Sequence, residues 1–131
     1  PCAGNLLASK LPRGRARQFI LRVAVRMTES WLLADMAQIA CFFAIPEGKL
    51  PRQPDAEAHP KKSLVRLVQL YSPDSIRRDV VPLPGHSGLT GPLYEERLAE
   101  FVRTRWEPIK AAKKSPSLKR SLRAIDRFLG A

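Results

Sequence analysis

The stretch Gln18-Phe-Ile-Leu-Arg-Val-Ala-Val25, followed by Arg26-Met-Thr-Glu-Ser-Trp-Leu-Leu-Ala-Asp35, carries the strongest fold signal in the sequence. Its first part is almost continuously apolar, which is typical of a strand buried on both faces of a sheet. Thr28 suits the N-cap of a helix, and Glu29 in the first turn suits the helix dipole. This order predicts a buried strand over about 18–25 that leads into a helix.

The remaining sequence predicts further helices separated by loops rich in proline and glycine, for a total of five or six. The helix that begins at Thr28 is expected to run to Pro46, and helical patterns also cover 61–71, 73–80, 93–106 and 116–129. Ser115 is expected to cap the last of these. The side chains expected to face the core are Leu32, Met36, Ile39, Phe43, Leu64, Leu67, Val68, Tyr71, Leu98, Phe101, Val102, Leu118, Leu122, Ile125 and Leu129.

One strand cannot form a sheet, so the pattern favours a predominantly helical α/β fragment whose other strands lie elsewhere. An all-α domain with a misread strand is the alternative. The 131 residues suit a single domain over 1–131. No apolar run approaches the roughly 18 residues of a membrane helix. Two cysteines are too few for a disulfide framework, and Cys41 is expected to be a small buried hydrophobe, so a cytoplasmic location is predicted.

The chain is strongly basic, with a formal net charge of +11. The excess is uneven, because residues 97–131 hold ten basic side chains and three acidic ones. Such a charge favours nucleic acid as the partner, although a solvated basic surface is the alternative reading. The side chains expected to contact a nucleic-acid backbone are Arg77, Arg78, Lys113, Lys114, Lys119, Arg120, Arg123 and Arg127.

The sequence contains few side chains in patterns that support catalysis. His59 and His86 are isolated and suit solvated loop positions. Glu29 and Asp35 are six residues apart, so they lie on different faces of a helix, and each also has a purely structural reading. Glu29 could be a helix-start carboxylate, and Asp35 could be a solvent-facing residue. Lys61 and Lys62 at a helix start oppose the helix dipole, which hints at a functional reason such as contact with phosphate.

The segment Met27-Thr28-Glu29-Ser30-Trp31 and its surroundings resemble a bacterial domain-of-unknown-function family. This family has a Toprim-like core and is related to the RloB and OLD nucleases. The resemblance continues through 50–56, 60–62, 76–82, 91–94 and 115–118, and it covers most of the chain from about residue 19. The early Glu and the Asp-x-Asp strand of that family have no counterpart here. The chain is therefore expected to be the C-terminal part of a longer protein.

The resemblance implies a Toprim-like, metal-dependent nuclease that acts in bacterial defence. It implies Mg²⁺ or Mn²⁺ as the cofactor, with Glu29 as a metal ligand and Asp35 as a further candidate. Lys61 or Lys62 would neutralise the scissile phosphate. An AAA-type ATPase is the partner that the resemblance implies, and a membrane partner is not expected. This chain alone is expected to be inactive because the other carboxylates are missing.

Two alternatives to the nuclease remain open. One is a basic helical module that binds nucleic acid without chemistry. The other is an interaction subunit whose apolar segments complete another chain or a second copy in a homodimer. The sequence does not distinguish DNA from RNA.

Overall fold

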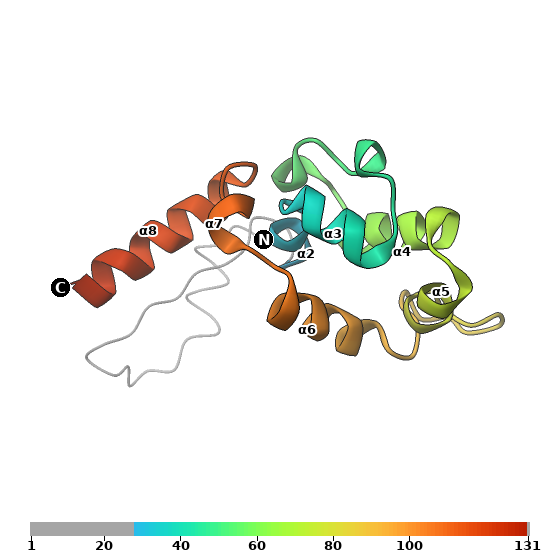
Figure 1. Ribbon diagram of the computed structural model, residues 1–131. Coiled ribbons are helices and arrows are strands. Elements are labelled where there is room, and N and C mark those ends of the chain that lie inside the picture. The colour runs from blue at the N-terminus through green and yellow to red at the C-terminus, as the bar shows by residue number, and fades with distance from the viewer. Residues whose placement is uncertain (1–27, 131) are drawn as a thin grey trace, which may run out of the picture.

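The computed structural model describes residues 28–130, in which helices joined by loops are the only regular secondary structure (Figure 1). Two short 3-10 helices, η1 and η2, lie in the proline-rich stretch between α3 and α4. In chain order the elements are α2 (Thr28–Leu33), α3 (Met36–Phe43), η1 (Glu47–Lys49), η2 (Pro54–Ala56), α4 (Pro60–Tyr71), α5 (Asp74–Val80), α6 (Tyr94–Thr104), α7 (Pro108–Ala111) and α8 (Pro116–Gly130).

The prediction of an α/β fragment is wrong for residues 28–130, which contain no strand, and the fold here is close to the all-α alternative. The physical reason is that the apolar stripes of these helices are buried against other helices, so no sheet is needed to cover them. The strand expected at 18–25 lies outside the described residues. Within those residues, no helix is both long and apolar enough to cross a membrane.

The helix expected from Thr28 to Pro46 is interrupted at Ala34 and Asp35. The side chain of Asp35 is 4% exposed, and its Oδ2 accepts a hydrogen bond of 2.7 Å from the backbone N–H of Glu107. The interruption therefore places a buried carboxylate against the start of α7. The second half of the predicted helix, α3, ends at Ala44, which takes the left-handed conformation with a φ of 53°.

The core lies between α2, α3, α4 and α6, and aromatic rings join α3 to α6. The ring centroids of Phe42 and Phe43 are 4.9 Å apart, and Phe42 lies 5.4 Å from Phe101 of α6. Leu64 and Val68 of α4 are fully buried in the same cluster. Rings at these separations contribute about 0.5–1.5 kcal/mol per pair beyond the area that they bury.

The predicted inward positions are confirmed near the middle of the fold and are wrong at its edges. Most of them are buried or partly buried, but Val102 of α6 is 40% exposed and Tyr71 of α4 is 37% exposed. The difference between predicted and observed burial is largest in the last helix. Leu118 is buried, whereas Ile125 is 39% and Leu129 is 76% exposed. The reason is that burial on α8 ends at Ala124, while its last turns extend away from the rest of the molecule (Figure 1). Cys41 is exposed, so its predicted burial is also wrong.

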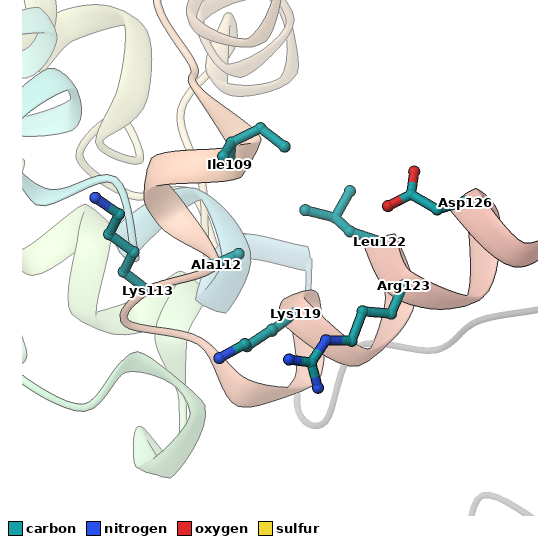
Figure 2. Close-up of a pocket in the computed structure, with 7 residues that line it drawn as sticks. All are labelled: Ile109, Ala112, Lys113, Lys119, Leu122, Arg123 and Asp126. Atoms are coloured by element: carbon teal, nitrogen blue, oxygen red, sulfur yellow. The ribbon is translucent and has the colours of Figure 1, made fainter.

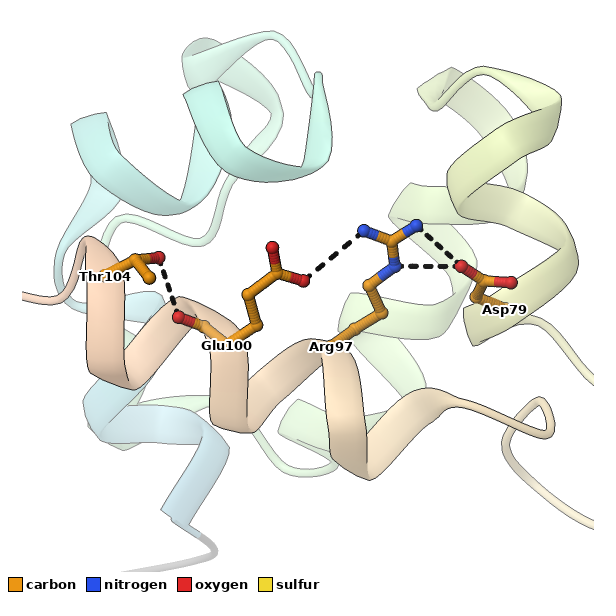
Figure 3. A network of polar contacts seen from close by, with 4 residues as sticks. All are labelled: Asp79, Arg97, Glu100 and Thr104. Atoms are coloured by element: carbon orange, nitrogen blue, oxygen red, sulfur yellow. Dashed lines mark hydrogen bonds and ion pairs between the residues drawn. The ribbon is translucent and has the colours of Figure 1, made fainter.

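An ion pair and a glycine hold α5 against α6 on either side of the 82–92 loop. Arg97 donates from Nε and Nη2 to Asp79 Oδ2, at 2.9 and 2.7 Å, and its Nη1 lies 3.5 Å from Glu100 (Figure 3). Gly91 donates its N–H to the Val80 carbonyl at 2.8 Å. A Cβ at Gly91 would come within 2.6 Å of two backbone carbonyl oxygens, so no larger residue fits.

The start of α8 is fixed by a carboxylate from a distant part of the chain. Asp55 of η2 accepts hydrogen bonds from Ser115 Oγ at 2.7 Å and from the Ser117 N–H at 2.8 Å. Ser115 in turn accepts the Leu118 N–H at 3.2 Å, which confirms its predicted N-cap role. Trp31 of α2 donates from Nε1 to Ser117 Oγ at 2.8 Å. These bonds attach α8 to both η2 and α2.

We expect Asp55→Ala to lower the free energy of unfolding by about 2 kcal/mol, because it removes a charged acceptor and leaves two donors without it. Denaturant unfolding followed by circular dichroism measures the loss. Asp126→Ala is the matched control, because Asp126 is exposed and forms no ion pair within residues 28–130; it should change stability by less than about 0.5 kcal/mol. A loss of the same size in both variants would contradict the role given to Asp55.

Candidate nucleic-acid interface

The structure brings Glu29 and Lys61, two of the predicted site residues, together at the junction of α2, α4 and α6. Glu29 is 6% exposed, and its Oε1 accepts a hydrogen bond from the Tyr94 hydroxyl at 2.9 Å. Lys61 Nζ lies 3.5 Å from the same Glu29 oxygen and 3.9 Å from Glu95 Oε1. The ammonium also lies 5.3 Å from the centre of the Tyr94 ring. Glu29 is thus partnered by two side chains of this chain.

The environment of Tyr94 shows how strongly this cluster is buried. Its ring is 1% exposed and packs in the core. Burial, together with the neighbouring Glu29 carboxylate, raises the pKa of the Tyr94 phenol far above its ordinary value. The phenol therefore stays protonated in the fold and keeps donating its hydrogen bond to Glu29.

Asp35, the other predicted metal ligand, belongs to a different polar network. It is buried, contrary to the solvent-facing reading, and its carboxylate accepts the Glu107 N–H. Among residues 28–130, no group of three or more His, Cys, Asp or Glu side chains is placed to hold a metal ion. The described residues therefore do not form a site that fits a divalent metal at Glu29 and Asp35, and Mg²⁺ or Mn²⁺ binding stays a prediction.

A second set of predicted residues lies at the α4–α5 end of the molecule. Lys62 and Arg77 line one hollow of about 770 Å³ together with Arg66, Leu70 and Leu89. Arg77 forms an ion pair with Asp74 within α5, so its charge is partly compensated. The α4–α5 end and α8 lie at opposite ends of the molecule (Figure 1). The predicted nucleic-acid contacts are therefore divided between two separate surfaces.

The densest basic surface of the described chain follows the end of α7 and the length of α8. We call this the α7–α8 basic surface and define it by six exposed side chains. None of the six forms an ion pair with another described residue. They are Lys113, Lys114, Lys119, Arg120, Arg123 and Arg127.

Lys110 of α7 differs from these six cations. Its Nζ lies 2.8 Å from Glu107 Oε2, and this hydrogen-bonded pair lowers the pKa of Glu107 and raises that of Lys110. Its charge is therefore compensated locally and contributes less to the field that a polyanion would meet.

A shallow hollow of about 220 Å³ separates α7 from α8 beside this surface (Figure 2). Ile109 of α7 and Leu122 of α8 form apolar parts of its lining, and Lys113, Lys119 and Arg123 lie along it. Asp126 is the acidic side chain in this lining. The surface is thus mainly cationic, with an apolar seam between its two helices.

Sequence reasoning missed the residues that position this surface. Asp55, which holds the start of α8, bonds to Ser115, 60 positions away, and Tyr94, which holds Glu29, bonds across 65 positions. No local pattern signals such pairs. Ser115 was the one detectable part, because a serine before Pro116 is an N-cap signal.

Comparison of the chain with protein-family models, curated sequences and solved structures found no match.

The Glu29–Tyr94 bond leads to a prediction about alkaline stability. Tyr94→Phe should cost about 1.5–3 kcal/mol near pH 8, because it removes a donor from a buried carboxylate. The unfolded phenol ionises near pH 10, whereas the raised pKa keeps the folded one protonated. Wild-type stability should therefore fall as the pH rises above about 10, and the gap to Tyr94→Phe should shrink.

Denaturant unfolding at pH 8 and at about pH 11 measures both effects. Tyr71→Phe, at an exposed ring, is the control and should change stability by less than about 0.5 kcal/mol. A difference between wild type and Tyr94→Phe that stays constant across this pH range would contradict the assignment.

Proposed function

We propose that this chain is a non-catalytic module that binds the phosphate backbone of nucleic acid through the α7–α8 basic surface. The observation that carries the proposal is the set of six exposed cations on α7–α8, none of which is neutralised by another described residue. An uncompensated charge of this density attracts a polyanion and releases its counterions on binding.

The spacing of the basic residues along α8 suits a linear ligand. Positions 119, 123 and 127 recur every four residues, and 120 lies beside them, so these cations form one stripe along α8. The stripe extends over about 12 Å at a rise of roughly 1.5 Å per residue. That length matches about three to four phosphates along one strand of a duplex. A rod-like polyanion is therefore a better fit than a compact anion.

The same surface offers little for reading a base sequence. Two aromatic residues of the last third of the chain are unavailable for stacking on bases, because Trp106 is partly buried and Tyr94 is fully buried in the hydrophobic clusters. Stacking on exposed rings is a main source of affinity for single strands. The proposal is therefore for binding that depends on charge and tolerates different sequences.

The nuclease expected from the resemblance, its AAA-type ATPase partner and a cytoplasmic location remain predictions. The adjacency of Glu29 and Lys61 agrees with a shared site, but both are engaged with Tyr94 and with each other. The proposed binding needs neither residue.

Reversing Lys119, Arg120 and Arg123 to Glu should weaken binding to a 20-base-pair DNA or RNA duplex by roughly 100-fold, since three attractive contacts become repulsive. Fluorescence anisotropy at fixed salt measures the affinity. The matched control reverses Lys49, Arg103 and Arg105, which are also exposed but lie outside α7–α8, with the same change in net charge. Equal losses in both triple variants would reduce the proposal to an effect of overall charge.

The salt dependence gives an independent count of contacts. Six phosphate contacts predict that log K falls with log salt at a slope of about −5 for duplex DNA. Lys119→Ala should make this slope shallower by about one, because it removes one contact. A slope near zero for the wild-type chain would contradict the proposal.

A further inference from the structure

A second cationic feature adjoins the α7–α8 basic surface and differs from it in shape. A hollow of about 500 Å³ lies between the α2–α3 junction, η1 and the end of α7. This size is within the range of about 300–1,000 Å³ that is usual for small-ligand sites. We call it the α3–α7 hollow. The residues that carry its chemistry are Met36, Ala37, Glu47, Arg52, Lys113 and Lys114.

We infer that the α3–α7 hollow binds a phosphate monoester at the end of a nucleic-acid strand; this rests on the proposed function for the strand itself. Arg52, Lys113 and Lys114 are exposed and form no ion pair with other described residues. They come from two separate parts of the chain and meet at one concave place. Lys113 also lines the α7–α8 hollow, so the two features are continuous.

The charges facing the hollow favour a dianion. Its carboxylates are Asp35, which is buried against the Glu107 N–H, and the exposed Glu47. Lys110 at the rim is paired with Glu107. Three unpaired cations therefore meet one exposed carboxylate. A terminal phosphate carries a charge of about −1.5 to −2 near pH 7, more than an internal diester, and offers three acceptor oxygens.

The position of the hollow beside the α7–α8 basic surface favours a strand end. A strand that lies along α8 can place its end in the adjoining hollow, where a terminal phosphate meets the three unpaired cations. Ala37 and Met36 supply apolar lining against which the last base or sugar can pack, and Glu47 can accept a hydrogen bond from a ribose hydroxyl. The ligand class is therefore a terminal nucleotide that bears a phosphate monoester.

The test compares four probes against the full chain: a single-stranded 12-mer with a 5′-phosphate, the same strand with a 3′-phosphate, the unphosphorylated strand, and adenosine monophosphate. We expect one terminal phosphate to tighten binding about tenfold over the unphosphorylated strand, as a charge-assisted contact allows. Arg52→Ala should abolish this preference and leave affinity for the unphosphorylated strand within about twofold, because Arg52 lies outside α7–α8.

A second variant separates shape from charge. Ala37→Phe fills the hollow without changing a charge, and should also abolish the preference for a terminal phosphate. Arg66→Ala removes one exposed arginine from the hollow at the α4–α5 end and should leave the preference unchanged. Circular dichroism confirms that each variant is folded.

The outcomes separate the two proposals. Equal affinity for all three strands overturns the terminal-phosphate site and leaves backbone binding by α7–α8 standing. If neither these strands nor the 20-base-pair duplex binds, the proposed function fails. In that case, adenosine monophosphate tests whether the α3–α7 hollow binds a phosphate monoester at all. Binding that needs the phosphate and is lost in Arg52→Ala supports a site for free nucleotides. Absence of such binding overturns the site.

Discussion

The carboxylate of Asp55 is the constraint on which the candidate interface depends. The buried residues of α8 lie between Ser117 and Ala124, and its hydrogen bonds to α2 and η2 are made at its start. Asp55 accepts both the Ser115 hydroxyl and the Ser117 N–H there, as an acidic group at a helix N-terminus should. Asp55 belongs to η2. The proline-rich stretch before α4 therefore holds the start of α8, a helix that begins about 60 positions later, by hydrogen bonds.

Helix α2 connects the start of α8 to the core. One of its side chains, Trp31, donates to Ser117 of α8, while its backbone carbonyl accepts the Trp106 indole N–H at 3.3 Å. Another, Glu29, accepts the Tyr94 hydroxyl on the α6 side. A short helix of six residues thus touches both the aromatic core and the start of the basic helix. The basic surface is therefore held in a fixed place by the core.

The sequence was informative where a signal is local. Prolines, serines and apolar stripes located α4, α5, α6 and α8 to within a few residues, and the Ser115 cap was correct. Periodicity shows that a helix has an apolar face but not what covers it, so Ile125, Leu129 and Val102 were wrongly placed inside. The break at Asp35 was not predicted from the sequence, because Asp35 is bonded to Glu107, 72 positions away, and no local pattern signals that contact.

For the candidate site too, the sequence showed local features but not contacts between distant parts of the chain. Charge counting selected the cations of α8, and the structure shows that they are exposed, as Lys and Arg side chains usually are. It did not show that Arg77 is paired or that the α4–α5 cations face a different end of the molecule. Glu29 and Lys61 were both selected, yet their mutual contact through a buried tyrosine followed only from the fold.

Mapping the contact surface tests the central claim most directly. We would titrate the ¹⁵N-labelled chain with a 20-base-pair duplex that lacks terminal phosphates and follow amide chemical shifts. The account predicts that shift changes concentrate on residues 113–127, while α4 and α5 stay unperturbed. Changes centred on Lys62, Arg66, Arg77 and Arg78, with α8 unaffected, would contradict it.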